Sequence, residues 1–324
     1  MNLITYDDII ETYLRIRQRG SSFLLSKINL FPSKRTISSF SSDMQRSGWW
    51  SVPLVYKRWN EIITGNPEIT YEKFFVEKFL DSKTNVSLLS LGCGEGTREM
   101  HLASNPIFSK VTGVDISYSR IKSANLRAKE NKLDNIFFIC NDVNNLNINQ
   151  EKFDVILFDN SLHHFKNVVK LLPSITSKYL KNNGFLVVNE YIGPKRLQWS
   201  DIQINYTNNT LAEIPEKFRT RYLTKSIKNR FTGPGLIRMF VSDPSEAVDS
   251  ENILPALRKY FEPIYEKFYG GNLLMHILKD IAHNFYEQNE ETKSLLTKLF
   301  MIEDELINIE KKSLMMFGIY KNAQ

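Results

Sequence analysis

The chain has 324 residues, of which 42% are hydrophobic and 24% are charged, and its formal net charge is +6. This composition is typical of a folded protein, and its basic residues are scattered rather than clustered, so no nucleic-acid partner is expected. No apolar run approaches the roughly 20 residues that a membrane helix needs. Two cysteines predict no disulfide framework. We therefore expect a cytoplasmic protein without membrane association, whose oligomeric state the sequence leaves open.

Residues 1–69 predict a helical segment that acts as a lid. Residues 4–18 carry apolar side chains at helical spacing, and the serine-rich residues 31–48 are typical of a loop. Three of the four tryptophans then lie within eleven positions. This aromatic cluster predicts either packing of the lid or a wall of a ligand cavity, to which Trp50 and Arg58 would contribute.

Residues 70–192 predict alternating strands and helices. An apolar run over residues 86–91 is followed by Gly92, Gly94 and Gly96, and then by a segment compatible with a helix. Glycines at alternate positions let the backbone turn sharply and let a ligand approach it, and the helix N-terminus beyond them offers free N–H groups. Further strands are expected over residues 110–115, 136–142, 153–160 and 185–191. A helix is expected over roughly residues 162–180, followed by a C-cap signal at Asn182, Asn183 and Gly184. Short connections between these elements predict a parallel sheet covered by helices on both faces.

Polar residues end each of these apolar strands. They are Gly92 to Gly96, Asp115, Asn141 with Asp142, Asp159 with Asn160, and Glu190 with Tyr191. The carboxyl ends of parallel strands meet at one edge of a sheet, where ligands bind in folds of this kind. This ordered set of polar ends therefore predicts a ligand site at that edge.

The regular alternation stops after Tyr191. Residues 193–260 predict an irregular cap over the cleft, with two or three helices before residue 248, and Asp243 within it is a candidate contact for the substrate. Residues 261–324 predict two more strands separated by helices. Two late strands would complete a sheet of seven.

The acid after the second strand fits two classes of cofactor. Asp115 lies 23 positions after Gly92, near the distance at which a dinucleotide fold places its ribose-binding acid, so an NAD(P)-dependent oxidoreductase is one alternative. The order Gly92-x-Gly94-x-Gly96 departs from the dinucleotide fingerprint, which has two residues before its third glycine. Asp142 also suits an adenine amino group.

In order and spacing, these motifs resemble those of class I S-adenosylmethionine-dependent methyltransferases over about residues 70–192. The resemblance implies a seven-stranded Rossmann-like sheet that is mostly parallel with its last strand reversed, S-adenosylmethionine as cofactor and S-adenosylhomocysteine as product. The residues that it implies in cofactor binding are Gly92, Cys93, Gly94, Gly96, Asp115, Ile116, Asn141, Asp142, Val143, Asp159 and Asn160. One departure is Ser90, since many members carry an acid two positions before the first glycine. The flanking segments are similar to those of a bacterial subgroup that acts on small molecules or peptides.

His163 and His164 follow the fourth strand on the predicted ligand edge. An imidazole has a pKa near 6.5, which suits removal of a proton from a hydroxyl or an ammonium group, and we slightly prefer His164 for this role. The alternative is that one histidine only packs at a helix start. Glu190 and Tyr191 would orient a substrate or make a structural hydrogen bond. No spacing of histidines and cysteines predicts a metal site.

We therefore expect a methyltransferase that acts on oxygen or nitrogen of a small molecule or a peptide, including a carboxylate or hydroxyl in natural-product biosynthesis. A carboxylate acceptor needs no base, whereas a hydroxyl or an amine does. The sequence leaves open methylation of a protein, a NAD(P)-dependent oxidoreductase, and a partner protein that binds the cofactor without catalysis.

Overall fold

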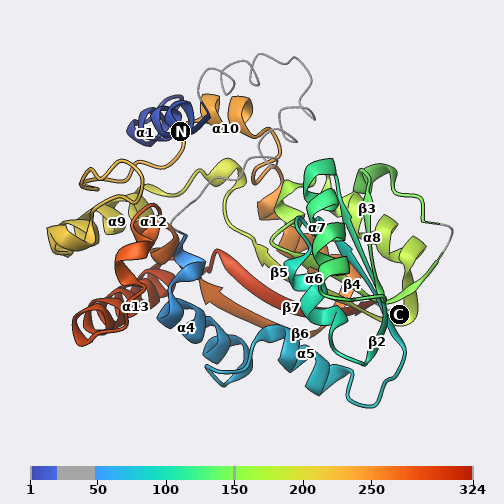
Figure 1. The fold of residues 1–324 in the computed structure, drawn as a ribbon. Helices are drawn as coiled ribbons and strands as arrows, with labels where there is room; N and C mark the ends of the chain where they lie inside the picture. Colours follow the sequence, from blue (N-terminus) through green and yellow to red (C-terminus); the bar gives the residue numbers. More distant parts are fainter. Residues whose placement is uncertain (1, 20–47, 149–150, 323–324) are drawn as a thin grey trace.

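The computed structural model describes residues 2–19, 48–148 and 151–322 (Figure 1). Its centre is a sheet of seven strands in the order β3-β2-β1-β4-β5-β7-β6. The strands are β1 (Val86–Leu91), β2 (Phe108–Asp115), β3 (Ile136–Cys140), β4 (Phe153–Asp159), β5 (Leu180–Tyr191), β6 (Phe261–Gly270) and β7 (Met315–Asn322). Strands β1 to β5 pair in parallel, and β7 runs antiparallel between β5 and β6. This confirms the predicted Rossmann-like sheet with a reversed last strand.

Helices cover both faces of the sheet because its central strands are apolar on both sides. All six residues of β1 are buried, as expected for a central parallel strand. One face carries α5 (Tyr71–Phe79), α6 (Thr97–Ala103) and α7 (Tyr118–Glu130), and α8 (Val168–Tyr179) and α11 (Ile253–Tyr260) lie on the other. The hydrophobic core on the face covered by α5, α6 and α7 extends into α4 (Pro53–Thr64), α12 (Leu274–Leu278) and α13 (Glu290–Glu310).

The predicted helix over residues 162–180 is present, but it begins later than expected. A short 3-10 turn, η3 (Leu162–His164), comes first, and α8 begins only after Asn167, whose backbone is left-handed with φ 53°. The helix ends at Tyr179, and the predicted cap near Gly184 lies inside β5 instead. Leu180 is 1% exposed and pairs with Phe153 of β4, so its burial in the sheet overrides the local turn signal.

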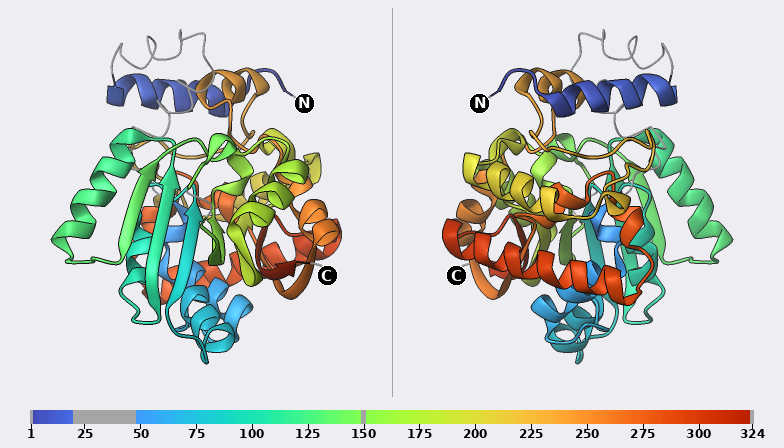
Figure 2. Two further views of the ribbon diagram at one scale, coloured as in Figure 1. Left: turned by 90° about the vertical axis from the view of Figure 1, so that its right-hand side faces the viewer. Right: turned by 90° about the vertical axis from the view of Figure 1, so that its left-hand side faces the viewer.

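The segment over residues 193–247 is irregular, as predicted. It contains α9 (Asp201–Glu213), α10 (Leu236–Ser242) and the 3-10 turns η4 (Lys195–Leu197) and η5 (Glu216–Phe218). The predicted N-terminal helix is present as α1 (Tyr6–Arg19), which lies across one end of the molecule beside α10 (Figures 1 and 2). The serine-rich loop predicted over residues 31–48 lies outside the described residues, except for residue 48.

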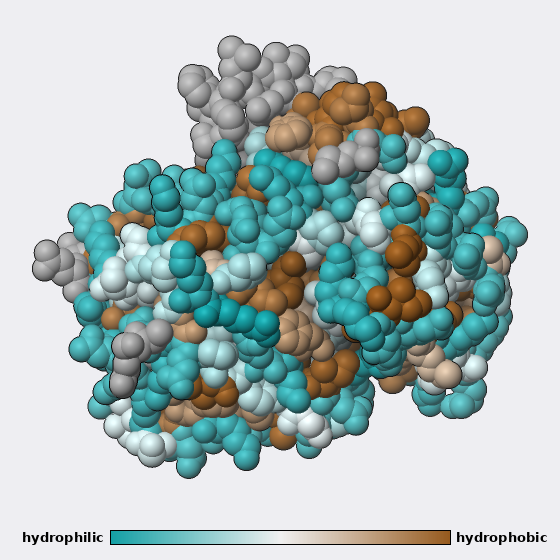
Figure 3. All heavy atoms as spheres, turned by 180° about the vertical axis from the view of Figure 1, so that it is seen from behind, coloured by the Kyte–Doolittle hydropathy of each residue, from teal (hydrophilic) through white to brown (hydrophobic). Residues whose placement is uncertain are grey.

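Helices α1 and α10 expose apolar side chains on their outer surface. Ile4 and Ile9 of the N-terminal segment are 65% and 61% exposed, and Phe240 of α10 is 53% exposed. Figure 3 shows hydrophobic atoms gathered over this end of the molecule. Among the described helices, none combines the length and the apolar composition needed to cross a membrane.

Candidate active site

The glycine turn between β1 and α6 has a backbone that requires glycine. The N–H groups of Gly92 and Cys93 donate to the carbonyl of Val114 over 2.7 and 3.1 Å, which ties the turn to β2. Gly96 caps α6 with φ 71°, and a Cβ there would lie 2.2 Å from the ring of Phe138. A Cβ on Gly94 would meet only Arg120 Nη1, at 3.4 Å. The outer side of the turn is therefore open to a ligand.

The ends of β2 and β3 meet this turn, as predicted. Asp115 is 7% exposed, and its carboxylate accepts from the N–H of Gly94 at 2.9 Å and from that of Ser117 at 2.8 Å. The N–H of Asn141 donates to the backbone carbonyl of Asp115 over 3.0 Å. Ile116, which follows Asp115 directly, is half-buried. The sheet thus gathers the first group of predicted cofactor residues in one place.

Asp142 and Val143 begin the 3-10 turn η2 (Val143–Asn145). The Asp142 carboxylate accepts from the N–H of Asn144 at 2.9 Å, and Val143 is buried. This contact fixes the loop after β3 and leaves the remaining acceptor positions of the Asp142 carboxylate for a further donor.

Asp159 and Asn160 end β4 within a polar network. Asp159 accepts from Arg98 Nε at 3.0 Å and from Asn189 Nδ2 at 2.7 Å. Arg98 also forms an ion pair with Glu72 of α5. Sequence reasoning missed Arg98 and Glu72, because nothing in the local pattern indicates that α5 packs beside the start of α6.

Glu99 supplies a carboxyl group beside Ser90, the position at which the sequence lacks an acid. Ser90 Oγ lies 2.6 Å from Glu99 Oε1, and the glutamate is only 2% exposed. Burial raises the pKa of Glu99 to about 7, although the hydrogen bond from Ser90 opposes this shift. The carboxyl group beneath the turn therefore comes from α6 and not from β1.

A cavity of about 800 Å³ extends from the end of β4 to the irregular segment and α1. Several predicted site residues line it, namely Trp50, Asn160, His163, His164, Tyr191 and Asp243. Its walls are rich in aromatic rings, contributed by Trp49, Tyr56, Trp59, Tyr71, Trp199, Phe231, Tyr269 and His276. Arg98 and Arg120 line the end beside the glycine turn. The cavity thus joins the cofactor edge of the sheet to the two histidines.

Arg58 and Glu190 do not line this cavity. Arg58 Nη2 lies 2.5 Å from Asp304 Oδ1, and its guanidinium stacks over Phe300 at 4.8 Å. Its contact with a substrate stays a prediction. Glu190 is fully buried behind His163.

Glu190 holds His163 in a charged form. His163 Nδ1 lies 2.5 Å from Glu190 Oε1, and the same carboxylate accepts from the backbone N–H groups of Ser161, Leu162 and Tyr191 at 2.9, 2.6 and 2.7 Å. Burial alone would lower the pKa of His163, but the charge and hydrogen bond of Glu190 raise it to about 9. At neutral pH this imidazole is therefore protonated.

His164 is neutral because it is buried beside the charged ring of His163. Its ring centre lies 4.1 Å from that of His163, and its Nδ1 lies 3.2 Å from Ser245 Oγ. Burial lowers the pKa of His164 below 6.5, and the positive charge of His163 lowers it further. The pair thus combines one imidazolium with one imidazole that is able to take up a proton.

Three residues here also have a spacing compatible with a shared metal ion, although we predicted no metal site. In the described part of the chain, the ligand-type atoms of His163, His164 and Glu246 all lie within 4.8 Å of one another. A metal ligand must be a neutral imidazole. A carboxylate behind the ring, as Glu190 lies behind His163, is also the usual partner of a metal-bound histidine, so this cluster is compatible with either a proton or a metal ion.

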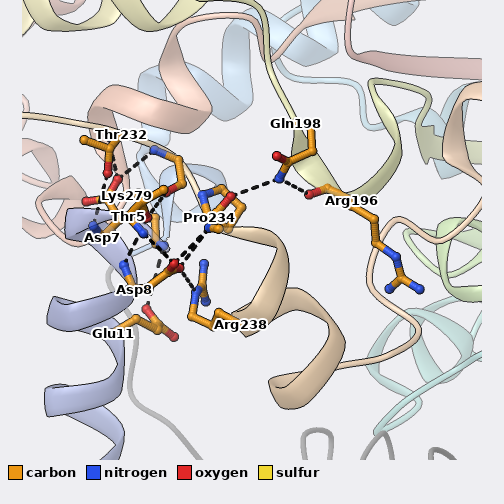
Figure 4. Close-up of polar contacts among 12 residues, drawn as sticks. Thr5, Asp7, Asp8, Glu11, Arg196, Gln198, Thr232, Pro234, Arg238 and Lys279 are labelled. Carbon is orange, nitrogen blue, oxygen red and sulfur yellow. Dashed lines mark hydrogen bonds and ion pairs between the residues drawn. The ribbon is translucent and has the colours of Figure 1, made fainter. Parts of the chain in front are cut away.

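Helix α1 closes the end of the cavity through polar contacts with the segment before α10 (Figure 4). Asp8 accepts from the N–H of Gly235 at 3.0 Å and from Arg238 Nε at 2.7 Å. Asp7 accepts from the N–H groups of Thr232 and Gly233 at 2.7 and 2.9 Å. We call these contacts of Asp7 and Asp8 the latch. Its partners lie more than 220 positions apart in the chain, so no local sequence pattern predicts it.

A family model and several known proteins match this chain. The family model described as a methyltransferase domain matches residues 82–258, which is more than half of the chain. A malonyl-[acyl-carrier protein] O-methyltransferase of Acetivibrio thermocellus is 22% identical over 232 residues, which cover 71% of this chain and 76% of that protein. A release factor glutamine methyltransferase of Buchnera aphidicola is 25% identical over 198 residues, covering 58% and 63%.

Solved structures show a more distant likeness. The plantazolicin methyltransferase BpumL in complex with SAH has a TM-score of 0.42 and 18% identity, and the match covers 97% of this chain and 100% of that one. The [4+2]-cyclase SpnF has a TM-score of 0.46 and 17% identity, with 78% and 80% covered.

Proposed function

Because this chain belongs to the class I S-adenosylmethionine-dependent methyltransferases, we propose that it methylates nitrogen or oxygen of a small molecule or a peptide. The observation that carries the proposal is the cavity that connects Asn160 and Arg98, at the cofactor edge, with His164. Its volume of about 800 Å³ is within the range of sites that enclose a small ligand. The family supports this reaction over the NAD(P)-dependent alternative.

The residues at the strand ends fit the cofactor of the family. The glycine turn, open above Gly94, would receive its methionine part, Asp115 would bind the ribose, and Asp142 with Val143 would hold the adenine. Once bound, the cofactor supplies a methyl group on a sulfonium, which passes to the nucleophile as the carbon–sulfur bond breaks and its electron pair stays on sulfur. Asn160 and Arg98 line the cofactor end of the cavity and would hold the cofactor beside the acceptor.

His164 is the residue that accepts the proton of a hydroxyl or ammonium nucleophile. Its pKa below 6.5 leaves the imidazole neutral at physiological pH, and the proton it gains would be stabilised by Glu246 and Asp243. His163 is a positioning residue here, because its charge keeps His164 neutral until the acceptor binds. Glu190 in turn keeps His163 charged.

The aromatic wall supports this chemistry by excluding water. Methyl transfer to a nucleophile is favoured when the nucleophile loses its hydration shell and is held in line with the methyl group. Rings from distant parts of the chain, such as Trp59, Trp199 and Tyr269, enclose the acceptor end. The latch between α1 and α10 closes the same end of the cavity.

Two measurements test the proposal. Isothermal titration with S-adenosylhomocysteine should give one site per chain, and incubation with methyl-labelled S-adenosylmethionine and cell extract should add about 14 daltons to an acceptor. No heat of binding would refute the cofactor assignment. Binding without any labelled product would favour a cofactor-binding protein without catalysis, and label on a large polypeptide would favour a protein acceptor.

A further inference from the structure

We infer that the group methylated by this protein is an amine, which enters as an ammonium ion and is bound by the acidic wall formed by Asp243 and Glu246 beside His164. This inference rests on the proposed methyl transfer and narrows its acceptor. Both acids line the cavity, and they follow α10 in a short segment that packs over η3.

The charges at this end of the cavity leave a surplus of negative charge. Glu190 comes from β5, Asp243 and Glu246 from the segment after α10, and the cations are His163 of η3 and Arg196 of η4. Three carboxylates therefore face two cations while His164 is neutral. A carboxylate acceptor would add to this surplus, whereas an ammonium ion would neutralise it.

Elsewhere in the cavity the ions occur as matched pairs. They are Arg238 with Asp8 at 2.7 Å, Lys279 with Glu11 at 3.7 Å, and Arg221 with Asp280 at 2.8 Å. Arg98, at the cofactor end, lies between Glu72 and Asp159. The acids in these groups match the cations beside them. Arg120 is the remaining arginine of the lining and lies beside the glycine turn, at the cofactor end of the cavity.

The acidic wall has a fixed geometry. Asp243 Oδ1 accepts from the N–H and the hydroxyl of Ser245 at 3.0 and 2.7 Å, and the same hydroxyl lies 3.2 Å from His164 Nδ1. Glu246 Oε1 lies 3.6 Å from His163 Nε2. The carboxylates and the neutral imidazole are therefore held around one region, which suits the three donors of a primary ammonium group.

Protons and charges balance with the ammonium ion, His164 and the methyl group that the cofactor supplies. The ammonium ion gives one proton to His164 and becomes an amine with a lone pair, while His164 becomes an imidazolium next to Glu246. The amine nitrogen then bonds to the methyl carbon as the carbon–sulfur bond breaks. The N-methylated product keeps a positive charge, and the proton on His164 returns to solvent when the product leaves.

The test compares three probes of one shape, benzylamine, benzyl alcohol and benzoate, titrated into the full chain saturated with S-adenosylhomocysteine at pH 7.5 in the presence of EDTA. Benzylamine should bind at least tenfold more tightly than the other two. The preference should fall to less than threefold in Asp243→Asn combined with Glu246→Gln. It should persist in Asp304→Asn, whose side chain is 57% exposed and pairs with Arg58 outside the cavity lining.

Other results overturn the inference. Equal binding of the three probes, a preference for benzoate, or no detectable binding of benzylamine would each do so. A preference that survives the double substitution would also contradict it, and one that appears only when Zn²⁺ replaces EDTA would make the cluster a metal site. If S-adenosylhomocysteine itself does not bind, the proposed function fails first, and the two failures are distinguished in the same titration.

Discussion

Ser90 Oγ and Glu99 Oε1 are joined by a 2.6 Å hydrogen bond beneath the glycine turn. The glutamate has a pKa of about 7 in the folded chain, compared with a usual value of 4.5. A raised carboxyl pKa means that the folded state holds the proton more tightly, so stability is full below pH 4.5 and declines as the pH rises through 7. The loss between these values is expected to be at most about 3 kcal/mol.

Glu99→Gln should remove this decline. The amide keeps the shape and still accepts from Ser90, but it carries no charge to bury, so the variant should be more stable than the parent at pH 8 and similar to it at pH 5. Urea unfolding at both pH values checks this expectation. Parallel curves for variant and parent across the range would contradict it, and Glu95→Gln, whose side chain is 47% exposed, is the matched control.

His164→Gln should lower the rate of methyl transfer by about 10²- to 10⁴-fold, the usual contribution of a positioned base. Affinity for S-adenosylhomocysteine should not change, because His164 lies at the acceptor end of the cavity. Single-turnover transfer of labelled methyl and a calorimetric titration measure the two quantities. His101→Gln, at an exposed position at the end of α6, serves as the control, and full activity of His164→Gln would remove the base from the mechanism.

Glu190→Gln should flatten the dependence of stability on pH above neutrality. In the parent, the pKa of His163 is raised from 6.5 to about 9 by Glu190, so its contribution to stability is full below pH 6.5 and is lost as the pH rises through 9. Without the carboxylate this window disappears, and the variant is less stable throughout because His163 is no longer paired. The free energy of unfolding at pH 6, 7.5 and 9 checks both points. The same decline in the variant as in the parent would show that Glu190 does not charge His163.

Asp8→Asn should loosen the latch between α1 and α10. The amide loses the ion pair to Arg238 and one acceptor for the Gly235 N–H group, and hydrogen bonds to a charged group contribute about 1.5–3 kcal/mol. We expect KM for the acceptor to rise by about tenfold while affinity for S-adenosylhomocysteine is unchanged. Glu213→Gln, a surface acid paired with Lys298, is the control. An unchanged KM would show that the latch does not close the cavity.

The meeting of the strand ends at one edge of the sheet could be predicted from the sequence because its signals are local. Gly92 directly follows β1 and Asp115 ends β2, and the topology alone brings strand ends together. The C-cap signal at residues 182–184 failed because of burial in the sheet. Burial of Leu180 against Phe153 is a tertiary effect, and no helix or turn pattern contains it.

The acceptor half depends on contacts between distant segments. Glu246 approaches His163 across more than 80 positions, and Asp8 approaches Arg238 across 230. The sequence also predicts that Glu190 lies at the end of a strand, but it does not predict the contact between Glu190 and His163. Such contacts depend on how the irregular segment packs. Periodicity and spacing in the sequence do not predict which of its residues meet distant parts of the chain.

The position of β7 between β5 and β6 has a consequence for the order of synthesis. Strands β1 to β5 are complete by Tyr191 and pair with one another, so the cofactor edge is formed early, although β5 also pairs with β7 later in the chain. β6 has no strand to pair with until residues 315–322 have left the ribosome, more than 40 residues later. A nascent chain is thus expected to acquire a cofactor-binding half before it has a closed acceptor cavity, and the exposed edges of β5 and β6 are the surfaces that a chaperone would have to protect in that interval.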